Sequence, residues 1–311
     1  MERASSRGTL PKQFTGMFAR PVFRMSAPKE FATLWKGYPF RIKFYFWTYK
    51  QLGRVVGLLQ GLFDGFWLGV LGRRALQLAD ECKYDSSQEY HGELHNKRGL
   101  FPWEEAVVAT YFRNCRRLLV GGAGGGREVL ALCQAGHEVD GFECHPELMT
   151  FANELLSKEG FAANVQLVPR DKCPDDDRVY DGIIVGWSAY MHIQGESKRV
   201  GFLKELRGKL APGAPLLISF WHPIGPVRLR LRVGARLGKL LRWLRRGESI
   251  QLGDSLQPYY THFFDREGVG AELRQAGFEL ALHDPWFGHE YAHAVGIATE
   301  LVAGHPSGTA T

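Results

Sequence analysis

Residues 118–128 read Leu-Leu-Val-Gly-Gly-Ala-Gly-Gly-Gly-Arg-Glu, and this stretch decides the fold class. A short apolar run ends in glycines, and a helix from Glu128 to Ala135 is expected directly after them. Gly122, Gly124 and Gly126 allow the backbone to turn sharply and to approach a ligand, toward which the free N–H groups of the helix would point. The pattern predicts a strand, a nucleotide-binding loop and a helix; a tight turn without a ligand is the alternative for the loop alone.

The loop does not match the dinucleotide-binding fingerprint. That fingerprint needs Gly or Ala three residues after its second glycine, and the residues so placed are Arg127 and Val129. The dinucleotide pattern therefore fails at this loop.

Strand and helix patterns alternate on both sides of this loop from Trp103 onward. Continuous apolar strands between helices are typical of a parallel sheet that is buried on both faces. The fold class predicted is α/β, a doubly wound, mostly parallel seven-stranded sheet with a helical N-terminal extension. The strands are expected at 117–120, 138–143, 165–168, 182–185, 215–220, 278–282 and 292–297, and the helices at 103–112, 128–135, 146–158, 198–210 and 266–276.

Acidic residues end the second and third expected strands. Glu143 lies 21 residues after Gly122, where a carboxylate can accept both ribose hydroxyls of an adenosine. Asp171 ends the third strand, where an adenine would lie. Further on, the segments 180–186 and 202–219 supply the fourth strand and a helix–turn–strand unit.

With these motifs in this order, residues 103–300 resemble the class I S-adenosylmethionine-dependent methyltransferases, which have a Rossmann-like fold. The resemblance implies S-adenosylmethionine as cofactor, Glu143 at its ribose, Asp171 at its adenine amino group and Trp187 as a wall beside the adenine. The glycine loop would line the methionine and ribose portions through Gly122, Ala123, Gly124 and Gly126.

The sequence departs from this family at one position. The family usually has an acid two residues before the first glycine, where this chain has Val120. Backbone carbonyls, water or Glu128 are the candidate substitutes for binding the cofactor's amino group.

Absent motifs narrow the function. The loop also resembles that of aminopropyltransferases, but the acids that hold a cationic amine in those enzymes are missing after the fourth strand, where the chain reads Trp187-Ser-Ala-Tyr-Met-His192. A base-methylation signature, a glutamate pair of the arginine-methylating kind and a cluster of acids for a metal are missing as well. The function predicted is methyl transfer to a small-molecule acceptor, hydrophobic or anionic. The alternative from another class is a non-catalytic membrane- or RNA-associated protein that keeps the fold.

Candidate acceptor-side residues follow the fourth and fifth strands, because ligands bind at the carboxyl ends of strands in open α/β sheets. His192 is predicted as general base, since an imidazole titrates near neutral pH. Tyr190 is the second catalytic candidate. His222, Tyr260 and His262 are the candidate substrate-binding residues, and packing in the core is the alternative role for each.

Residues 1–100 are predicted to form a helical cap rich in aromatic residues and glycine. Gly53, Gly57, Gly61, Gly65 and Gly69 recur at every fourth position, so that backbones could approach closely along one helix face. Asp64 and Arg54 interrupt the apolar run, which disfavours a transmembrane helix. A soluble helical hairpin and a helix at a membrane surface are both expected alternatives.

Residues 224–256 form an insertion with a basic amphipathic helix, whose leucines at 237, 240, 241 and 244 have helical spacing. Contact with an anionic membrane, a lid over the pocket, packing against the cap, and an anionic partner such as RNA are the alternatives. Nucleic acid is disfavoured, because aromatic stacking platforms are missing.

The composition is that of a globular protein, with 45% hydrophobic and 23% charged residues in 311. The net charge is +6. Residues 1–50 carry +8 and residues 227–248 carry +7, so the rest of the chain carries −9. Five cysteines without a zinc-like spacing and the lack of a secretory signal pattern predict reduced thiols and a cytoplasmic protein, peripheral at a membrane if the basic helix binds lipid. Residues 301–311 are expected to be disordered.

Overall fold

The computed structural model describes residues 37–87, 90–224, 227–245, 249–285 and 291–300. The expected C-terminal tail and the basic segment 1–36 lie outside the described residues. By its contacts the chain divides into residues 1–52 and 53–311. Residues 73–96 pack with the segment that follows them, and the domain boundary expected near residue 100 stays a prediction.

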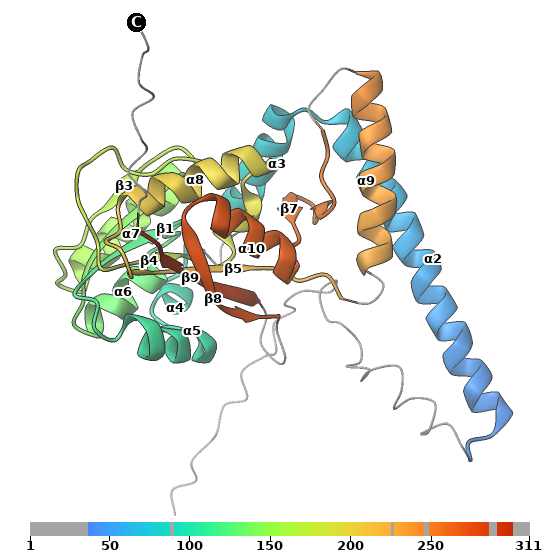
Figure 1. Ribbon diagram of the computed structural model, residues 1–311, viewed down its shortest axis with the longest axis horizontal. Coiled ribbons are helices and arrows are strands. Elements are labelled where there is room, and N and C mark those ends of the chain that lie inside the picture. Colours follow the sequence, from blue (N-terminus) through green and yellow to red (C-terminus); the bar gives the residue numbers. More distant parts are fainter. Residues whose placement is uncertain (1–36, 88–89, 225–226, 246–248, 286–290, 301–311) are drawn as a thin grey trace, which may run out of the picture. The chain divides into compact units, whose positions relative to one another are not determined.

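A seven-stranded sheet forms the core of the second unit, in the order β3-β2-β1-β4-β5-β9-β8 (Figure 1). The strands β1 to β5 pair in parallel, and β9 is antiparallel to both β5 and β8. The predicted doubly wound, mostly parallel α/β fold is therefore confirmed. The strands are β1 (Arg117–Gly121), β2 (Glu138–Glu143), β3 (Val165–Leu167), β4 (Gly182–Val185), β5 (Pro215–Phe220), β8 (Phe278–Asp284) and β9 (Ala292–Ala298).

Helices cover both faces of this sheet, as the continuous apolar strands predicted. Successive strand residues point to opposite faces, so Leu119 and Ile183 join one buried cluster with α8 and α10, while Leu118 and Ile184 join another with α5, α6 and α7. The helices of the described residues are α2 (Phe40–Val70), α3 (Arg73–Asp85), α4 (Glu93–Asn96), α5 (Pro102–Val107), α6 (Arg127–Gln134), α7 (Pro146–Lys158), α8 (Glu196–Gly208), α9 (Val227–Leu244) and α10 (Arg266–Gln275), with a π-helix η1 (Val108–Phe112) and a 3-10 helix η2 (Ala189–His192).

The insertion after β5 contains more than the expected helix. The helix α9 begins at Val227, so residues 227–233, which alternate between aliphatic residues and arginine, are helical. A two-stranded antiparallel sheet follows it, formed by β6 (Asp254–Leu256) and β7 (Tyr260–His262). Its strands of three residues are too short to give a clear alternating pattern in the sequence.

The glycine stripe of α2 packs against α9, which runs parallel to it (Figure 1). A Cβ atom added at Gly61 would lie 2.7 Å from the carbonyl oxygen of Arg230, and one added at Gly65 would lie 2.6 Å from that of Gly234. Only residues without a side chain allow this approach. The close packing of backbones expected along the stripe is therefore present, and α9 is its partner.

An ion pair joins the same two helices. The Asp64 carboxylate accepts a hydrogen bond from Arg230 Nε at 2.8 Å and another from Ser255 Oγ at 2.7 Å. Asp64 is the acid that interrupts the apolar run, and its charge is buried at this contact. In the described part of the chain no single helix is long and apolar enough to cross a membrane; α2 and α3 meet that criterion only as a pair, bent by 117°.

Candidate cofactor and acceptor site

The glycine loop lies at the carboxyl end of β1, between β2 and β4. Gly122, Gly124 and Gly126 have φ angles of 63°, 53° and 94°, a region that residues with a Cβ atom rarely adopt. The backbone N–H of Ala123 donates a hydrogen bond to the carbonyl oxygen of Phe142 at 3.0 Å, which holds the loop against β2. The loop leads directly into α6, so the sequence prediction for this turn agrees with the structure.

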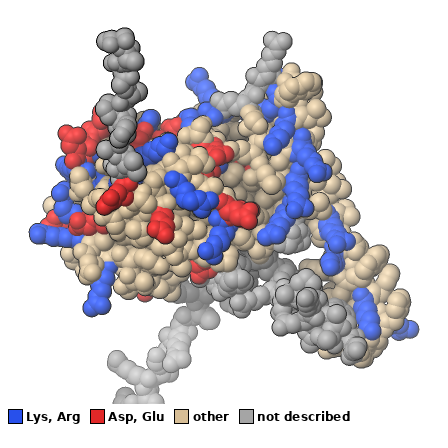
Figure 2. Space-filling model, in the orientation of Figure 1, with Lys and Arg blue, Asp and Glu red and all other residues tan. Residues whose placement is uncertain are grey.

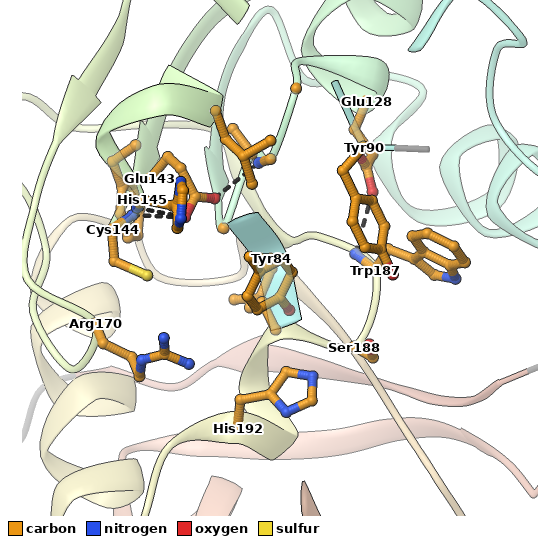
Figure 3. A pocket seen from close by; sticks show the side chains of 18 of the residues that line it. Tyr84, Tyr90, Glu128, Glu143, Cys144, His145, Arg170, Trp187, Ser188 and His192 are labelled. Atoms are coloured by element: carbon orange, nitrogen blue, oxygen red, sulfur yellow. Dashed lines mark hydrogen bonds between the residues drawn. The ribbon is translucent and has the colours of Figure 1, made fainter. Parts of the chain in front are cut away.

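Glu143, the last residue of β2, faces this loop (Figure 3). One carboxylate oxygen accepts a hydrogen bond from the N–H of Gly124 at 2.8 Å. The other accepts hydrogen bonds from the N–H groups of Cys144 at 2.7 Å and His145 at 2.9 Å. Three backbone donors thus hold a buried carboxylate in one orientation beside the glycine loop, where the sequence placed it.

A buried ionic cluster lies at the start of α6, on the other side of the loop. The guanidinium of Arg127 donates to both oxygens of Glu104 at 2.7 Å and to the carboxylate of Glu128 at 2.7 Å. Burial disfavours the charged form of Arg127, but the carboxylates of Glu104 and Glu128 outweigh this effect and raise the pKa of Arg127. Burial also raises the pKa of Glu104. With all three groups ionised, the cluster carries one net negative charge, and Arg127 and Glu128 line the pocket.

Trp187 follows β4 and closes the pocket opposite Glu143. Its backbone N–H donates to the Glu128 carboxylate at 3.1 Å. Its ring lies among other aromatic rings, with centroid distances of 5.2 Å to His95 and 5.6 Å to Tyr291. Its indole N–H is buried and has no hydrogen-bond partner among the described residues. Trp187 thus lines the pocket, and its role as a wall beside an adenine stays a prediction.

His192, at the end of η2, forms another part of the pocket wall (Figure 3). Its Nδ1 atom lies 2.9 Å from the carbonyl oxygen of Tyr260, which can only accept, so Nδ1 carries the proton. The lone pair is therefore on Nε2. Burial lowers the pKa of His192, which keeps the ring neutral at pH 7. The rings of Tyr84 and Tyr259 lie 6.5 Å and 5.2 Å from it, between centroids.

An ion pair lies close to His192. Arg170 lines the pocket and donates a hydrogen bond to one carboxylate oxygen of Asp80, a residue of α3 that is 1% exposed. The second oxygen of Asp80 is buried and has no hydrogen-bond partner within the described ranges. Burial raises the pKa of Asp80, against the effect of Arg170. The pocket thus has polar groups on the His192 side as well as at the glycine loop.

The structure places six predicted site residues outside this pocket's lining, namely Gly126, Asp171, Tyr190, His222, Tyr260 and His262. Asp171 forms an ion pair with Lys198 and lines a neighbouring surface pocket. Tyr190 is fully buried in the core and donates its hydroxyl hydrogen to Glu272. Tyr260 and His262 both contact the buried carboxylate of Asp254, each at 2.7 Å. Asp171, Tyr190, Tyr260 and His262 thus lie away from this pocket's lining, and the roles expected of them stay predictions.

His222 likewise lies away from the pocket's lining. Its Nδ1 atom is 3.1 Å from the carbonyl oxygen of Phe264, and burial lowers its pKa. The residues that line the pocket around His192 are Tyr84, Tyr259 and Arg170 instead.

Residues upstream of the predicted domain complete the pocket. Asn96 donates hydrogen bonds to the carbonyl oxygens of Tyr90 and Gly92, and a Cβ atom added at Gly125 would lie 2.6 Å from the Asn96 amide nitrogen. Tyr84 and Tyr90 project into the cavity, whose volume is about 100 Å³ (Figure 3). Ligand pockets for small molecules usually have a volume of about 300 Å³ or more, so this cavity is smaller than a usual ligand pocket.

Within the described residues, no group of three or more His, Cys, Asp or Glu side chains could hold a metal ion. All five cysteines lie in the described ranges and are free. Burial raises the pKa of the Cys144 thiol, which lines the pocket, to about 12, so this thiol is not a nucleophile at neutral pH.

No protein-family model matches the sequence, and no curated protein matches it. Solved structures do match. A SAM-dependent methyltransferase from Methanosarcina mazei is similar at 16% identity and a TM-score of 0.53, covering 65% of this chain and 99% of its own. A 1,6-didemethyltoxoflavin-N1-methyltransferase from Burkholderia thailandensis is 17% identical, with a TM-score of 0.49, and covers 72% of this chain and 90% of its own. The sheet order and the first of these likenesses agree: the chain has the fold of the S-adenosylmethionine-dependent methyltransferases.

Proposed function

We propose that this protein transfers a methyl group from S-adenosylmethionine to a small-molecule acceptor. The observation that carries the proposal is the pairing of the glycine loop with Glu143 at the carboxyl ends of β1 and β2. In open α/β sheets this edge is where nucleotide-like ligands bind. A carboxylate there suits a ribose hydroxyl of an adenosine, since Glu143 keeps an acceptor position beyond its three backbone donors.

The groups around the loop fit the remaining parts of the donor. Trp187 offers an aromatic face and an indole N–H without a partner in the described structure, next to the loop. Backbone N–H groups at the start of α6 suit the carboxylate of the methionine portion. When bound, S-adenosylmethionine supplies an electrophilic methyl group on a sulfonium.

Glu128 is the proposed carboxylate for the donor's ammonium group. The family's usual acid is replaced by Val120, which is fully buried in the core and has no polar atom. Glu128 reaches the same edge of the sheet from α6, because its carboxylate bonds to the N–H of Trp187 directly after β4. The cluster that it forms with Arg127 and Glu104 has an excess negative charge, which an ammonium group would balance.

His192 is the proposed general base. Its Nε2 lone pair is available because Nδ1 donates to the Tyr260 carbonyl, and its lowered pKa keeps it unprotonated at pH 7. Burial raises the pKa of both Tyr84 and Tyr259, so their hydroxyl groups are hydrogen-bond donors there. Aromatic rings and a neutral base suit an acceptor with an acidic O–H or N–H group on an apolar or aromatic body.

The direct test is product analysis with labelled S-adenosylmethionine and a library of phenols, amines and carboxylic acids. Methyl transfer releases S-adenosylhomocysteine, whereas an aminopropyltransferase would release methylthioadenosine from decarboxylated S-adenosylmethionine. The proposal expects S-adenosylhomocysteine together with a methylated acceptor, and a loss of activity in His192→Gln. Binding of the donor with no turnover on any class of acceptor would favour a binding protein that keeps the fold.

A further inference from the structure

The outer face of α2 is apolar over more than three turns. Between Val55 and Trp67 the exposed side chains are apolar except for Gln60. We call the apolar ones the apolar ridge; they are 37–62% exposed, and they are Val55, Val56, Leu58, Leu59, Leu62, Phe63, Phe66 and Trp67. Contiguous exposed apolar surface of this kind marks an interaction site in soluble and membrane-associated proteins alike.

The opposite face of α2 explains why the ridge is free of charge. That face is closed by α9, against which Gly61 and Gly65 pack at backbone contact distance. The one acid of α2, Asp64, points into this contact and is neutralised there by Arg230 at 2.8 Å. Between residues 55 and 67 the helix therefore directs its one charged residue and its glycines inward, and its large apolar side chains outward.

Basic residues lie on the exposed side of α9, the helix that packs against α2. Arg228, Arg232, Arg236 and Lys239 are exposed and lie on one face of this helix by their spacing; we call them the basic row. Figure 2 shows Lys and Arg side chains gathered along α9. The helix has no acidic residue.

An apolar edge of α9 connects the apolar ridge of α2 to the basic row. Arg230, Val233, Leu237 and Leu241 face α2. At 100° per residue, the exposed Leu229, Leu240 and Leu244 lie between these residues and the basic row. An apolar surface thus continues from α2 onto α9 and ends at a line of positive charge.

We propose that the apolar ridge and the basic row dock this protein on the surface of an anionic phospholipid bilayer. A helix with aromatic and aliphatic residues on one side and Arg or Lys beside them lies in the interface, with its apolar side chains at the acyl boundary and its cations at the phosphates. The surface is proposed as a docking face and not a span, because the other side of α2 packs against α9 through Gly61 and Gly65.

Charge favours an anionic bilayer over a second copy of the chain as the binding partner of this surface. A two-fold symmetric dimer through the ridge would bring two basic rows near each other, and neither helix carries an exposed acid to compensate. An anionic bilayer supplies the opposite charge along its whole surface.

The test is flotation of the full chain with vesicles of phosphatidylcholine alone and of phosphatidylcholine mixed with phosphatidylglycerol. The proposal expects retention on the anionic vesicles, at least about tenfold weaker on the neutral ones, because each basic side chain near the surface adds to the attraction. Raising the salt to about 1 M should release most of the bound protein, since it screens the basic row. Flotation needs neither donor nor acceptor, so its result does not depend on the proposed function.

Two variants separate the parts of the surface. Leu59→Asp with Phe63→Asp removes apolar contact on the ridge, and Arg232→Glu with Arg236→Glu reverses two charges in the basic row. Each is expected to weaken binding to anionic vesicles by about tenfold or more. Val179→Asp is the matched control: Val179 is an exposed apolar residue at 53%, outside both helices, and its replacement should not change flotation.

Circular dichroism and thermal unfolding would show that each variant is folded. The proposal is overturned if folded wild-type protein floats with neither kind of vesicle, or if both double variants float as the wild type does. It is also overturned if light scattering shows a wild-type dimer that the ridge variant dissociates while vesicles are not bound.

Discussion

The carboxylate of Glu143 accepts a 2.8 Å hydrogen bond from the backbone N–H of Gly124, although 19 residues separate the two in the chain. The bond fixes the end of β2 to the middle of the glycine loop. Because Gly124 has a φ of 53°, its N–H points toward β2 in a conformation that other residues rarely adopt. The pairing is the geometric basis for the nucleoside site that we propose at this edge of the sheet.

Replacing Glu128 should weaken binding of the methionine portion of the donor and leave binding of the adenosine portion almost unchanged. In Glu128→Gln the cluster with Arg127 and Glu104 loses its excess charge, so affinity for S-adenosylmethionine should fall at least about tenfold, the usual loss for one charge-assisted hydrogen bond. Affinity for 5′-methylthioadenosine, which has no ammonium group, should change little. Calorimetric titration with both ligands measures the difference. Glu105→Gln, at an exposed position of α5, is the control, and equal losses for the two ligands would contradict the role of Glu128.

His192 should make both activity and stability depend on pH. Its pKa is lowered from 6.5, mainly by burial and despite Asp80, so as the pH falls below 6.5 the unfolded chain binds a proton before the folded chain does. Burial lowers the pKa of His222 and His283 in the same direction. The free energy of unfolding should therefore decrease as the pH falls from 7 toward 5, and His192→Gln should make this decrease shallower. Thermal unfolding across this pH range measures it, and a flat profile in the wild type would contradict the assignment.

The rate of methyl transfer should follow the same protonation of His192. A base with a lowered pKa stays active below pH 6.5, so the rate should be constant around pH 7 and fall only in more acidic solution. A rate that continues to rise well above pH 7 would instead point to ionisation of the acceptor.

Tyr190 should act on stability rather than on catalysis. It is fully buried, and its hydroxyl donates to Glu272, which also binds Arg199 at 2.7 Å. Tyr190→Phe leaves a buried carboxylate with one partner fewer, which should cost about 1–3 kcal/mol in the free energy of unfolding. Urea unfolding and the rate at saturating donor are the two measurements. A large loss of rate with unchanged stability would restore Tyr190 as a catalytic residue.

The packing of α2 against α9 can be tested at two glycines of the same helix. A methyl group at Gly65 would meet the backbone of Gly234 at 2.6 Å, so Gly65→Ala should cost about 1–3 kcal/mol through overpacking. Nothing lies within 4 Å of the corresponding position at Gly53, so Gly53→Ala should be neutral or stabilise the protein by up to about 1 kcal/mol through helix propensity. Chemical unfolding measures both, and equal effects would show that the helices do not pack as described.

The sequence predicted the sheet well because its strands are continuous apolar runs between helices. β2, β4 and β5 begin and end at the residues expected. Glu143 was predictable for a local reason, since an acid at a strand end beside a glycine loop has few other uses. The hairpin of β6 and β7 was missed, because three-residue strands have no periodicity to detect.

Much of the acceptor side could not be predicted, because its contacts are not local. Asp171 forms an ion pair with Lys198 on α8, 27 residues later. The hydroxyl of Tyr260 donates a hydrogen bond to Asp254, and its carbonyl oxygen accepts one from His192. Tyr84 and Tyr90 belong to a segment without any motif. Only the fold shows that they enter the pocket.

The most direct measurement is calorimetric titration of the folded full chain with S-adenosylmethionine, in the wild type, Glu143→Gln and Glu138→Gln. Glu138 begins the same strand that Glu143 ends, and it is paired with Arg116 at the surface, so it controls for the loss of a charge on β2. We predict micromolar binding to the wild type and to Glu138→Gln, weakened about tenfold or more in Glu143→Gln. No binding to the wild type, or equal affinity in all three proteins, would contradict a nucleoside site at the glycine loop.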